Sequence, residues 1–365
     1  MSDLKLKRIF TRKTIFLAAA VISVLAAVWI VVGRHQDTVY YEYDATTKRV
    51  SYSYFSDGDA FKVTIGPNGH NELPNIISIQ KAEKPVDLAS ASWKLLSSAR
   101  TDYLPPMVFM AAKDGDGARA FYTGGAHGGD GGGGGDRTAK NTKWSVMIDG
   151  REVIATSSGY AKELRGIVIN ELMAYNTVSS GRYAIRQSFM LDMTDSGTEV
   201  SAEVKALEPV VVLTDNGPQA YFGGFTESQM IVDSKLPGRT PLDPSAVSGR
   251  RDQYERAWLL LMKSRDGTMA CWVDRGFEAG DGRYVAPTSS FIRGGGKGRA
   301  KFYNAIVAAK KTSLSAGDSY RWRGGYHFFA DTQGDGFDTR TELTIGGERR
   351  SVLVTHEGIS SIAPL

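Results

Sequence analysis

Cysteine and histidine are scarce in this sequence of 365 residues. Cys271 is the only cysteine, so no disulfide can form within the chain and the fold must be stabilised by its core. Cys271 lies in an apolar, strand-like run, which predicts a buried and unreactive thiol. The five histidines are scattered and lack the spacing of a zinc site.

Excess charge of one sign is nearly absent as well. The formal net charge is +4, and residues 1–13 alone carry five basic residues against one acid. The rest of the chain is therefore close to neutral. A neutral domain has no broad basic field, which argues against a nucleic-acid partner.

The signatures of several enzyme classes are missing. The sequence has no G-x-S-x-G nucleophile elbow, no phosphate-binding loop and no dinucleotide fingerprint between a strand and a helix. It also shows no apolar stripe at helical spacing that persists over several turns. A mainly helical domain and the common α/β enzyme folds are therefore not expected.

The one long apolar run lies near the N-terminus. Residues 14–33 contain no charge, and as a helix they would span about 30 Å, the thickness of the bilayer's hydrocarbon core. A cleaved signal peptide is the alternative, but the run is long for one and Val31-Val32-Gly33 is a poor cleavage site. We expect a cytoplasmic basic tip (1–13), a transmembrane anchor (14–33), a linker (34–37) and an exported domain (38–365) in the periplasm or outside the cell.

From Val39 onward, apolar and polar residues alternate with period two, as in strands with one buried face. Asp149-Gly150 is a preferred dipeptide for a two-residue hairpin turn, and Gly346-Gly347 separates two further strand-like runs. The pattern predicts an all-β domain, a large antiparallel two-sheet sandwich, with a small β lobe near residues 38–85 as an option.

Glycine is concentrated in one stretch, Phe121–Arg137. Between its opening aromatic pair and its closing Asp136-Arg137, nine glycines surround a single histidine, His127, and one acid, Asp130. Glycine runs form poor cores, but they allow a backbone to approach a ligand closely. His127 is a candidate general acid or base, because its ordinary pKa lies near neutrality. A solvent-exposed histidine in a flexible loop is the alternative.

Several segments together resemble a known family. They are the run Gly124–Glu152, Ile169–Glu171, Tyr175–Thr177, Gly181–Tyr183 and Val200–Leu207. This texture, over about residues 120–215, resembles the galactose-mutarotase-like β-supersandwich proteins. The resemblance implies a carbohydrate-active or carbohydrate-binding domain that holds sugar on the concave face of a large sheet. The mutarotases use a His/Glu pair, but no catalytic position of theirs aligns with this chain, and fold alone does not fix function.

The segment Arg321–Asp331 is the second candidate site. As one strand it would place Arg321, Arg323, His327 and Asp331 on one face. The aromatic residues Tyr320, Trp322, Tyr326 and Phe328 would then share the opposite face. Arginines suit the carboxylate of an acidic sugar, and His327 suits proton transfer. The alternatives are a solvated face with a salt bridge, or a bulge at Gly324-Gly325 that moves His327 to the aromatic face.

Two further groups of polar residues follow the same reasoning. Arg182 and Arg186 alternate with apolar residues, and Glu171 and Asn176 interrupt a neighbouring apolar run. They are candidates for substrate binding, with Glu171 as a second proton carrier. Exposed positions on a half-solvated sheet explain them equally well.

The stretch from Asp331 to Glu342 nearly matches a calcium-binding loop. Asp331, Gln333, Asp335 and Glu342 have the spacing of its ligands, although the flanking segments look like strands rather than helices. A plain hairpin turn is the main alternative. Calcium is thus the one candidate cofactor, and otherwise none is expected.

These features predict a membrane-anchored, exported protein that acts on a poly- or oligosaccharide as a lyase or a hydrolase. His127 and His327 would transfer protons, with Tyr326 as another proton acceptor, and Arg182 and Arg323 would orient the substrate. Hydrolysis would need two suitably spaced carboxylates, and no such pair is evident. The alternative is a non-catalytic module that binds glycan or an envelope partner, in which Trp322 and Trp272 would matter more than the histidines.

Overall fold

The computed structural model describes residues 38–98, 102–115, 119–221, 223–232, 237–240, 248–249, 257–294, 301–330, 339–355 and 358–364. Residues 14–33, the expected transmembrane anchor, lie outside these ranges. Within the described ranges, no helix has the length and apolar character needed to cross a bilayer. The chain divides between Thr38 and Val39, and the unit described below begins at Val39.

Strands account for nearly all regular structure in the described residues, and every strand pairing within the sheets is antiparallel. The prediction of an all-β antiparallel domain is confirmed. Two sheets were expected, whereas the strands that the structure describes form five. Three short 3₁₀ turns complete the described elements: η1 (Ala112–Asp114), η2 (Val178–Ser180) and η3 (Glu278–Asp281).

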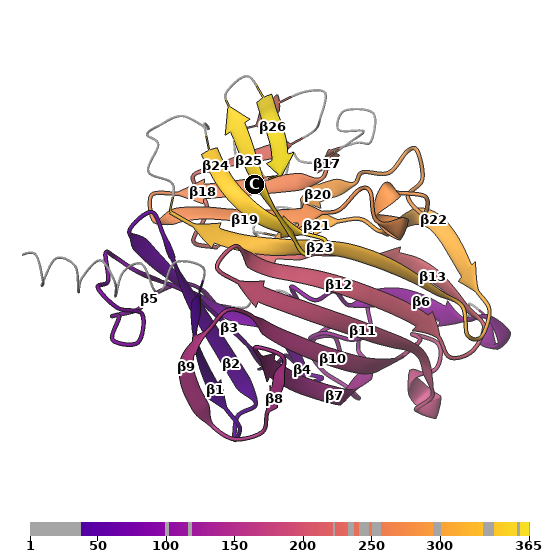
Figure 1. Cartoon of the computed structure of the whole chain (residues 1–365). Coiled ribbons are helices and arrows are strands. Elements are labelled where there is room, and N and C mark those ends of the chain that lie inside the picture. Colours follow the sequence, from indigo (N-terminus) through magenta and orange to yellow (C-terminus); the bar gives the residue numbers. More distant parts are fainter. Residues whose placement is uncertain are drawn as a thin grey trace, which may run out of the picture. The chain divides into compact units, whose positions relative to one another are not determined.

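The largest sheet has ten strands, and β12, β11, β10 and β7 follow one another within it (Figure 1). In order across the sheet, its strands are β16 (Pro237–Thr240), β15 (Ser228–Val232), β18 (Leu259–Ser264), β19 (Gly267–Val273), β23 (Ser319–Phe329), β12 (Gly197–Ala206), β11 (Tyr183–Thr194), β10 (Leu164–Met173), β7 (Ala139–Ile148) and β8 (Arg151–Val153).

A six-stranded sheet contains the strands of residues 38–85 and two strands from further along the chain. Its order is β5 (Lys94–Ser98), β4 (Leu73–Ala82), β3 (Asp59–Asn68), β2 (Arg49–Ser56), β1 (Val39–Asp44) and β9 (Ser157–Ala161). The chain passes from β8 of the large sheet to β9 of this sheet and then back to β10, so it connects the two sheets twice.

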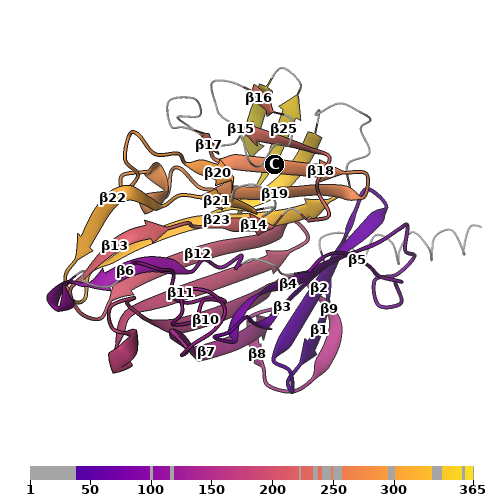
Figure 2. The ribbon, with the colours of Figure 1, turned by 180° about the vertical axis from the view of Figure 1, so that it is seen from behind.

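Three smaller sheets complete the domain. The sheet of β22 (Val307–Leu314), β13 (Val210–Asp215) and β6 (Met107–Ala111) is seen best from behind (Figure 2). The others are β14 (Gln219–Tyr221), β21 (Lys301–Asn304), β20 (Ile292–Gly294) and β17 (Ser248–Gly249), then β24 (Thr339–Ile345), β25 (Glu348–Thr355) and β26 (Gly358–Pro364).

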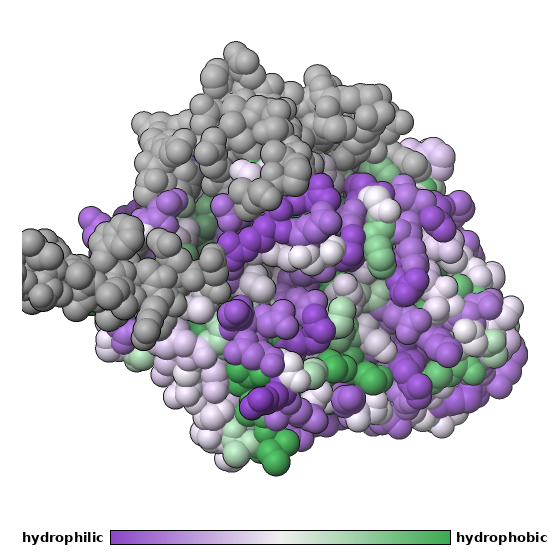
Figure 3. Space-filling view, in the orientation of Figure 1, coloured by the Kyte–Doolittle hydropathy of each residue, from purple (hydrophilic) through white to green (hydrophobic). Residues whose placement is uncertain are grey.

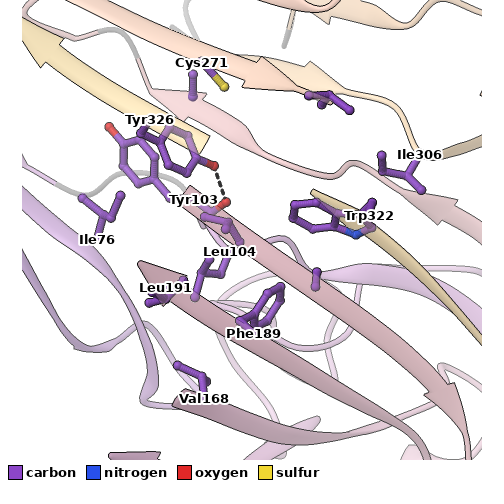
Figure 4. Packing of buried hydrophobic residues seen from close by; sticks show 14 of the residues in the cluster. Ile76, Tyr103, Leu104, Val168, Phe189, Leu191, Cys271, Ile306, Trp322 and Tyr326 are labelled. Atoms are coloured by element: carbon purple, nitrogen blue, oxygen red, sulfur yellow. Dashed lines mark hydrogen bonds between the residues drawn. The ribbon is translucent and has the colours of Figure 1, made fainter. Parts of the chain in front are cut away.

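Period-two patterning explains how the large sheet buries one face. Buried and partly exposed residues alternate along β10, and one buried cluster joins Phe189 of β11 and Trp322 of β23 with Phe109 of β6. Figure 4 shows part of this cluster, including the hydrogen bond that the Tyr326 hydroxyl donates to the Tyr103 carbonyl oxygen at 2.6 Å. Hydrophilic residues cover most of the coloured surface in Figure 3, with smaller hydrophobic patches between them.

Local turn chemistry agrees with the sequence. Asp149 and Gly150 have φ values of 46° and 78°, so both adopt the left-handed conformation that a type I′ hairpin turn requires. Cys271 is fully buried in β19, as predicted, and burial raises the pKa of its thiol.

Side chains of β2 replace a missing strand partner of β23. The pairing of β12 with β23 reaches no further than Tyr326, so the last residues of β23 have no strand on that side. There the Tyr54 hydroxyl donates to the Phe328 carbonyl oxygen at 2.6 Å and accepts from the Phe328 N–H at 3.1 Å. Ser56 accepts a hydrogen bond from the Ala330 N–H at 3.0 Å.

We therefore expect Tyr54→Phe to destabilise the domain by about 2 to 3 kcal/mol, because two buried backbone groups lose their partner. Urea unfolding would measure the change. Tyr43→Phe is the control, since the Tyr43 hydroxyl forms no hydrogen bond with the described residues, and it should stay within about 0.5 kcal/mol of the parent. Equal stability of the two variants would contradict this role of Tyr54.

Candidate functional site

The glycine-rich loop has a defined conformation. It leads directly into β7, and its backbone is closed by hydrogen bonds such as Gly128 N–H to Gly132 O at 2.7 Å and Gly129 N–H to Asp136 O at 2.9 Å. Asp130 is exposed, and its carboxylate accepts hydrogen bonds from the N–H groups of Gly132 and Gly134. These bonds lower the pKa of Asp130. Hydrogen bonds therefore hold the loop around His127 in one conformation.

Asn71, in the connection between β3 and β4, holds this loop in place through hydrogen bonds. Its buried carboxamide donates to the carbonyl oxygens of Gly125 and His127 at 2.9 Å and 2.8 Å. The same group accepts hydrogen bonds from the N–H groups of Thr138 and Ala139 at 2.8 Å and 3.1 Å. Asn71 thus positions the backbone on both sides of His127 and at the start of β7.

A buried carboxyl group lies beside His127. The His127 Nε2 and Asp102 Oδ2 atoms are 3.7 Å apart, and the Asp102 side chain is only 5% exposed. Gly125 permits this approach: it has a φ of +52°, and a Cβ atom there would lie 2.5 Å from the Asp102 Cγ atom. The Asp102 Oδ1 and His127 Nδ1 atoms are buried, and neither has a hydrogen-bond partner among the described residues.

Burial shifts the pKa of both groups in the direction that favours their neutral forms. Loss of water raises the pKa of Asp102 to about 7, against the opposing effects of Lys301 and the Ala126 N–H group. Loss of water also lowers the pKa of His127, and the positive charge of Lys301 adds to that. The pair therefore combines a carboxylic acid and a neutral imidazole, two groups able to exchange protons near neutral pH.

Tyr122 and an arginine complete the arrangement. The rings of Tyr122 and His127 have centroids 5.4 Å apart. The Tyr122 hydroxyl accepts hydrogen bonds from Asn216 at 3.3 Å and from Arg293 at 3.2 Å, and Arg293 also donates to Asn216 at 2.8 Å. We call Asp102, Tyr122, His127, Asn216 and Arg293 the Asp102–His127 cluster. Because the hydroxyl oxygen already accepts two bonds, its hydrogen is directed elsewhere.

Sequence reasoning found only His127 of this cluster. Asp102 precedes β6, Asn216 follows β13, and Arg293 lies in β20, so the members come from separate parts of the chain. Tyr122 lies at the start of the glycine-rich stretch, where the sequence alone indicates no chemical role for it. The signal at the others is slight: each is a polar residue next to an apolar run.

The other predicted catalytic residues lie elsewhere. His327 is buried between the rings of Tyr54 and Phe329, at centroid distances of 5.5 Å and 5.3 Å. Loss of water lowers the pKa of His327 to about 4. Tyr326 is buried as well, and burial raises the pKa of its hydroxyl. The pairing of β23 with its neighbours is continuous, so no bulge moves His327 to the opposite face.

The predicted binding residues are engaged within the fold. Arg186 and Lys140 lie 3.0 Å and 3.1 Å from the Glu171 carboxylate, and hydrogen bonding from Arg186 is the main cause of its lowered pKa. Each of the other arginines also pairs with acids: Arg182 with Glu208 and Asp114, Arg321 with Glu278, and Arg323 with Asp274.

Asn176 and Trp322 have structural surroundings too. Asn176 forms hydrogen bonds with both backbone groups of Ala111, at 2.9 Å and 3.0 Å. Trp322 is buried and packs edge-on against Phe189 at 6.3 Å (Figure 4). These residues connect strands and fill the core, and they do not gather around His127.

The calcium prediction falls largely outside the described residues. Asp331 and Asp335 belong to the part that is not described, and Glu342 is exposed in β24, 3.7 Å from Arg349. Within the described ranges, no three His, Cys, Asp or Glu side chains are grouped so as to hold a metal ion. Calcium binding stays a prediction.

No protein-family model and no curated protein matches this sequence. Among solved structures, the chain is similar to a GH36 α-galactosidase from Geobacillus stearothermophilus, at 8% identity and a TM-score of 0.40, over 77% of this chain and 41% of that one. It is also similar to a heparinase III, at 8% identity and a TM-score of 0.29, over 86% of this chain and 41% of that one.

A third similar structure is a galactose mutarotase-like protein from Clostridium acetobutylicum, which belongs to the group that the sequence resembles. Its identity is 8% and its TM-score 0.35, over 80% of this chain and 98% of that one. The chain spans 41% of the length of the α-galactosidase and of the heparinase. TM-scores this low support no conclusion about activity, so the function proposed below rests on this chain's own residues.

The raised pKa of Asp102 gives a test of the cluster's electrostatics. An unfolded Asp102 titrates at 3.8 and the folded one at about 7, so the folded state loses stability as the pH rises through this window. We expect Asp102→Asn to be more stable than the parent at pH 8, by up to about 4 kcal/mol, and nearly equal to it at pH 4.

Urea unfolding of both proteins across this pH range would measure the difference. Asp87→Asn is a suitable comparison, because hydrogen bonding from Tyr160 lowers the pKa of that carboxyl group. Its effect should have the opposite sign at neutral pH. If Asp102→Asn is destabilised equally at every pH, the Asp102 carboxyl group is not protonated by burial.

Proposed function

We propose that this protein cleaves an acidic saccharide by elimination at a uronate residue. The observation that carries the proposal is the placement of His127 beside a buried carboxyl group and beside the ring of Tyr122, whose hydroxyl accepts a hydrogen bond from Arg293. A base, an acid and a cation in one cluster are the groups that this reaction needs.

The reaction would proceed through proton transfer on both sides of the scissile bond. The His127 imidazole takes the proton from the sugar carbon next to the carboxylate, and the electron pair forms a carbon–carbon double bond. The bond from the neighbouring carbon to the glycosidic oxygen breaks, and Tyr122 donates its hydroxyl proton to that oxygen. Arg293 stabilises the charge on Tyr122, and Lys301 supplies a second positive charge near Asp102 and His127.

Asp102 would act by stabilising the protonated form of His127 that arises during the reaction. Its carboxyl group lies 3.7 Å from the Nε2 atom of the imidazole, and once it is ionised, as the pH rises through its pKa of about 7, its negative charge stabilises the imidazolium that forms after proton abstraction. Hydrolysis would instead require two carboxylates across the bond, about 5 to 10 Å apart. The other acid whose charge acts on His127, Asp130, is exposed and accepts hydrogen bonds from its own loop, which leaves Asp102 as the carboxyl group of the cluster and favours elimination.

We expect His127→Ala and Tyr122→Phe each to lower the rate of elimination at least about 100-fold, the usual contribution of a general base or acid. The substrates would be alginate, polygalacturonate, hyaluronan and heparan sulfate. The measurement is the ultraviolet absorbance of the conjugated double bond. His70→Gln is the matched control, because its amide can replace the hydrogen bond of His70 to Gly135 O and it lies outside the cluster.

Unchanged rates in both cluster variants would remove these residues from the mechanism. If the parent protein binds an acidic saccharide but forms no double bond, the protein is a non-catalytic binding module, which is the rival function.

We propose further that residues 14–33 anchor the protein in a membrane, with the domain from residue 38 onward exported. The uncharged run and the basic residues before it support this. The full chain should remain with membranes after a high-salt wash, and deletion of residues 1–37 should release it. Release of the full chain by salt alone would refute the anchor.

A further inference from the structure

A groove adjoins the end of the glycine loop, where Arg137 and Ala139 line it. Its volume is about 480 Å³, within the range of small-ligand sites. It is lined by the β1–β2 turn, the connection between β3 and β4, the start of β7, and the first residue of β11. The lining residues are Thr46, Thr47, Lys48, Pro67, Asn71, Glu72, Pro74, Arg137, Ala139, Lys140, Asn141, Trp144 and Tyr183.

Cations outnumber acids among the residues that line this groove, although Lys140 is also paired with Glu171 outside the lining. Lys48, Arg137 and Lys140 line it, and Glu72 is the one carboxylate among its lining residues. Arg137 pairs with Glu72 at 2.7 Å, but both side chains are more than half exposed. Exposed ion pairs contribute little stability, so an anionic ligand can compete with Glu72 for Arg137.

Two aromatic side chains lie in the same groove. Trp144 is half-buried, and its indole N–H donates to the Lys48 carbonyl oxygen at 2.9 Å, which ties β7 to the β1–β2 turn. Gly166 of the neighbouring strand leaves room for the indole, since a Cβ atom there would lie 3.0 Å from it. The Lys140 ammonium lies 4.2 Å from the Tyr183 ring centroid, which fixes that cation in place.

Asn71 connects the groove with the Asp102–His127 cluster. Asn71 is one of the residues that line the groove, and its side chain donates a hydrogen bond to the His127 carbonyl oxygen. Arg137 and Ala139, at the end of the glycine loop, line the groove as well. A saccharide chain bound at His127 would therefore have a surface of charged and aromatic side chains next to the same glycine loop.

We propose that this groove is a subsite for an anionic saccharide. It would bind sugar residues of the substrate that lie beyond the glycosidic bond that is cleaved. Trp144 provides apolar contact for a sugar ring, and Lys48 and Arg137 neutralise carboxylate or sulfate groups. The inference deepens the proposed function and rests on it for the identity of the substrate.

Binding is tested without turnover in a His127→Ala background, with hexasaccharides of alginate and hyaluronan as probes. We expect Lys48→Asn with Arg137→Gln to weaken binding about tenfold at low salt, and the difference to shrink at high salt because the charges are screened. Asparagine suits position 48, whose φ of 54° is left-handed. Trp144→Ala should weaken binding at both salt concentrations.

The matched control replaces two exposed lysines outside the groove, Lys143→Gln with Lys162→Gln, and should leave the affinity unchanged. A neutral glucan hexasaccharide should bind poorly to every variant. Thermal unfolding would identify any variant that is not folded, and the charge variants remain informative if Trp144→Ala unfolds.

The outcomes separate the two proposals. If the groove variants bind as the His127→Ala parent does, while His127 is required for elimination, the groove is no subsite and the proposed function stands. If the groove variants lose binding but no double bond forms with any polysaccharide, the binding site stands and the lyase function falls. Equal weakening by the control lysines would show nonspecific charge attraction and overturn the groove proposal.

Discussion

The carboxamide of Asn71 is the interaction on which the site depends. A run rich in glycine loses much conformational entropy when it becomes ordered, and it has few side chains with which to recover that cost. Asn71 supplies hydrogen bonds to Gly125, His127, Thr138 and Ala139 from one buried position. A single side chain from the β3–β4 connection therefore orders the loop, sets the direction in which His127 leaves the backbone, and joins the loop to the first residue of β7.

The sheets explain why that position is rigid. The Tyr54 hydroxyl closes the backbone of β23 where β12 no longer accompanies it, and the Tyr52 hydroxyl lies 2.6 Å from the Thr198 Oγ1 atom of β12. The six-stranded sheet is thus joined to the large sheet by buried polar contacts as well as by apolar packing. Since Asn71 lies in the connection between two strands of the six-stranded sheet, these contacts also determine where the glycine loop is placed.

Much of the fold could be predicted from the sequence, because alternation and turn residues are local signals. Asp149-Gly150 forms the expected hairpin, and Cys271 is buried in a strand. The division into five sheets could not be predicted, because it depends on pairings between distant segments, such as β1 with β9 and β12 with β23.

The site was predictable only in part. His127 stood out because glycines surround it, whereas Asp102 and Arg293 come together with it only through the fold. The arginines at 182, 186, 321 and 323 have the spacing of a binding face, but spacing along a strand does not reveal the acid on the neighbouring segment that each one meets. His327 shows the same limit, since both faces of β23 are covered at its C-terminal end.

The close approach of Gly125 to Asp102 restricts which substitutions this site can accept during evolution. A side chain at 125 and a carboxyl group at 102 compete for the same volume, because a Cβ atom at 125 would lie 2.5 Å from the Asp102 Cγ atom. Substitution at either position alters what the other can tolerate. In related chains the two positions should therefore covary: glycine at 125 should accompany an acid at 102, and a bulkier residue at 125 should appear only where 102 has become small. That pairing would mark, from sequence alone, which relatives retain the buried carboxyl group beside the histidine.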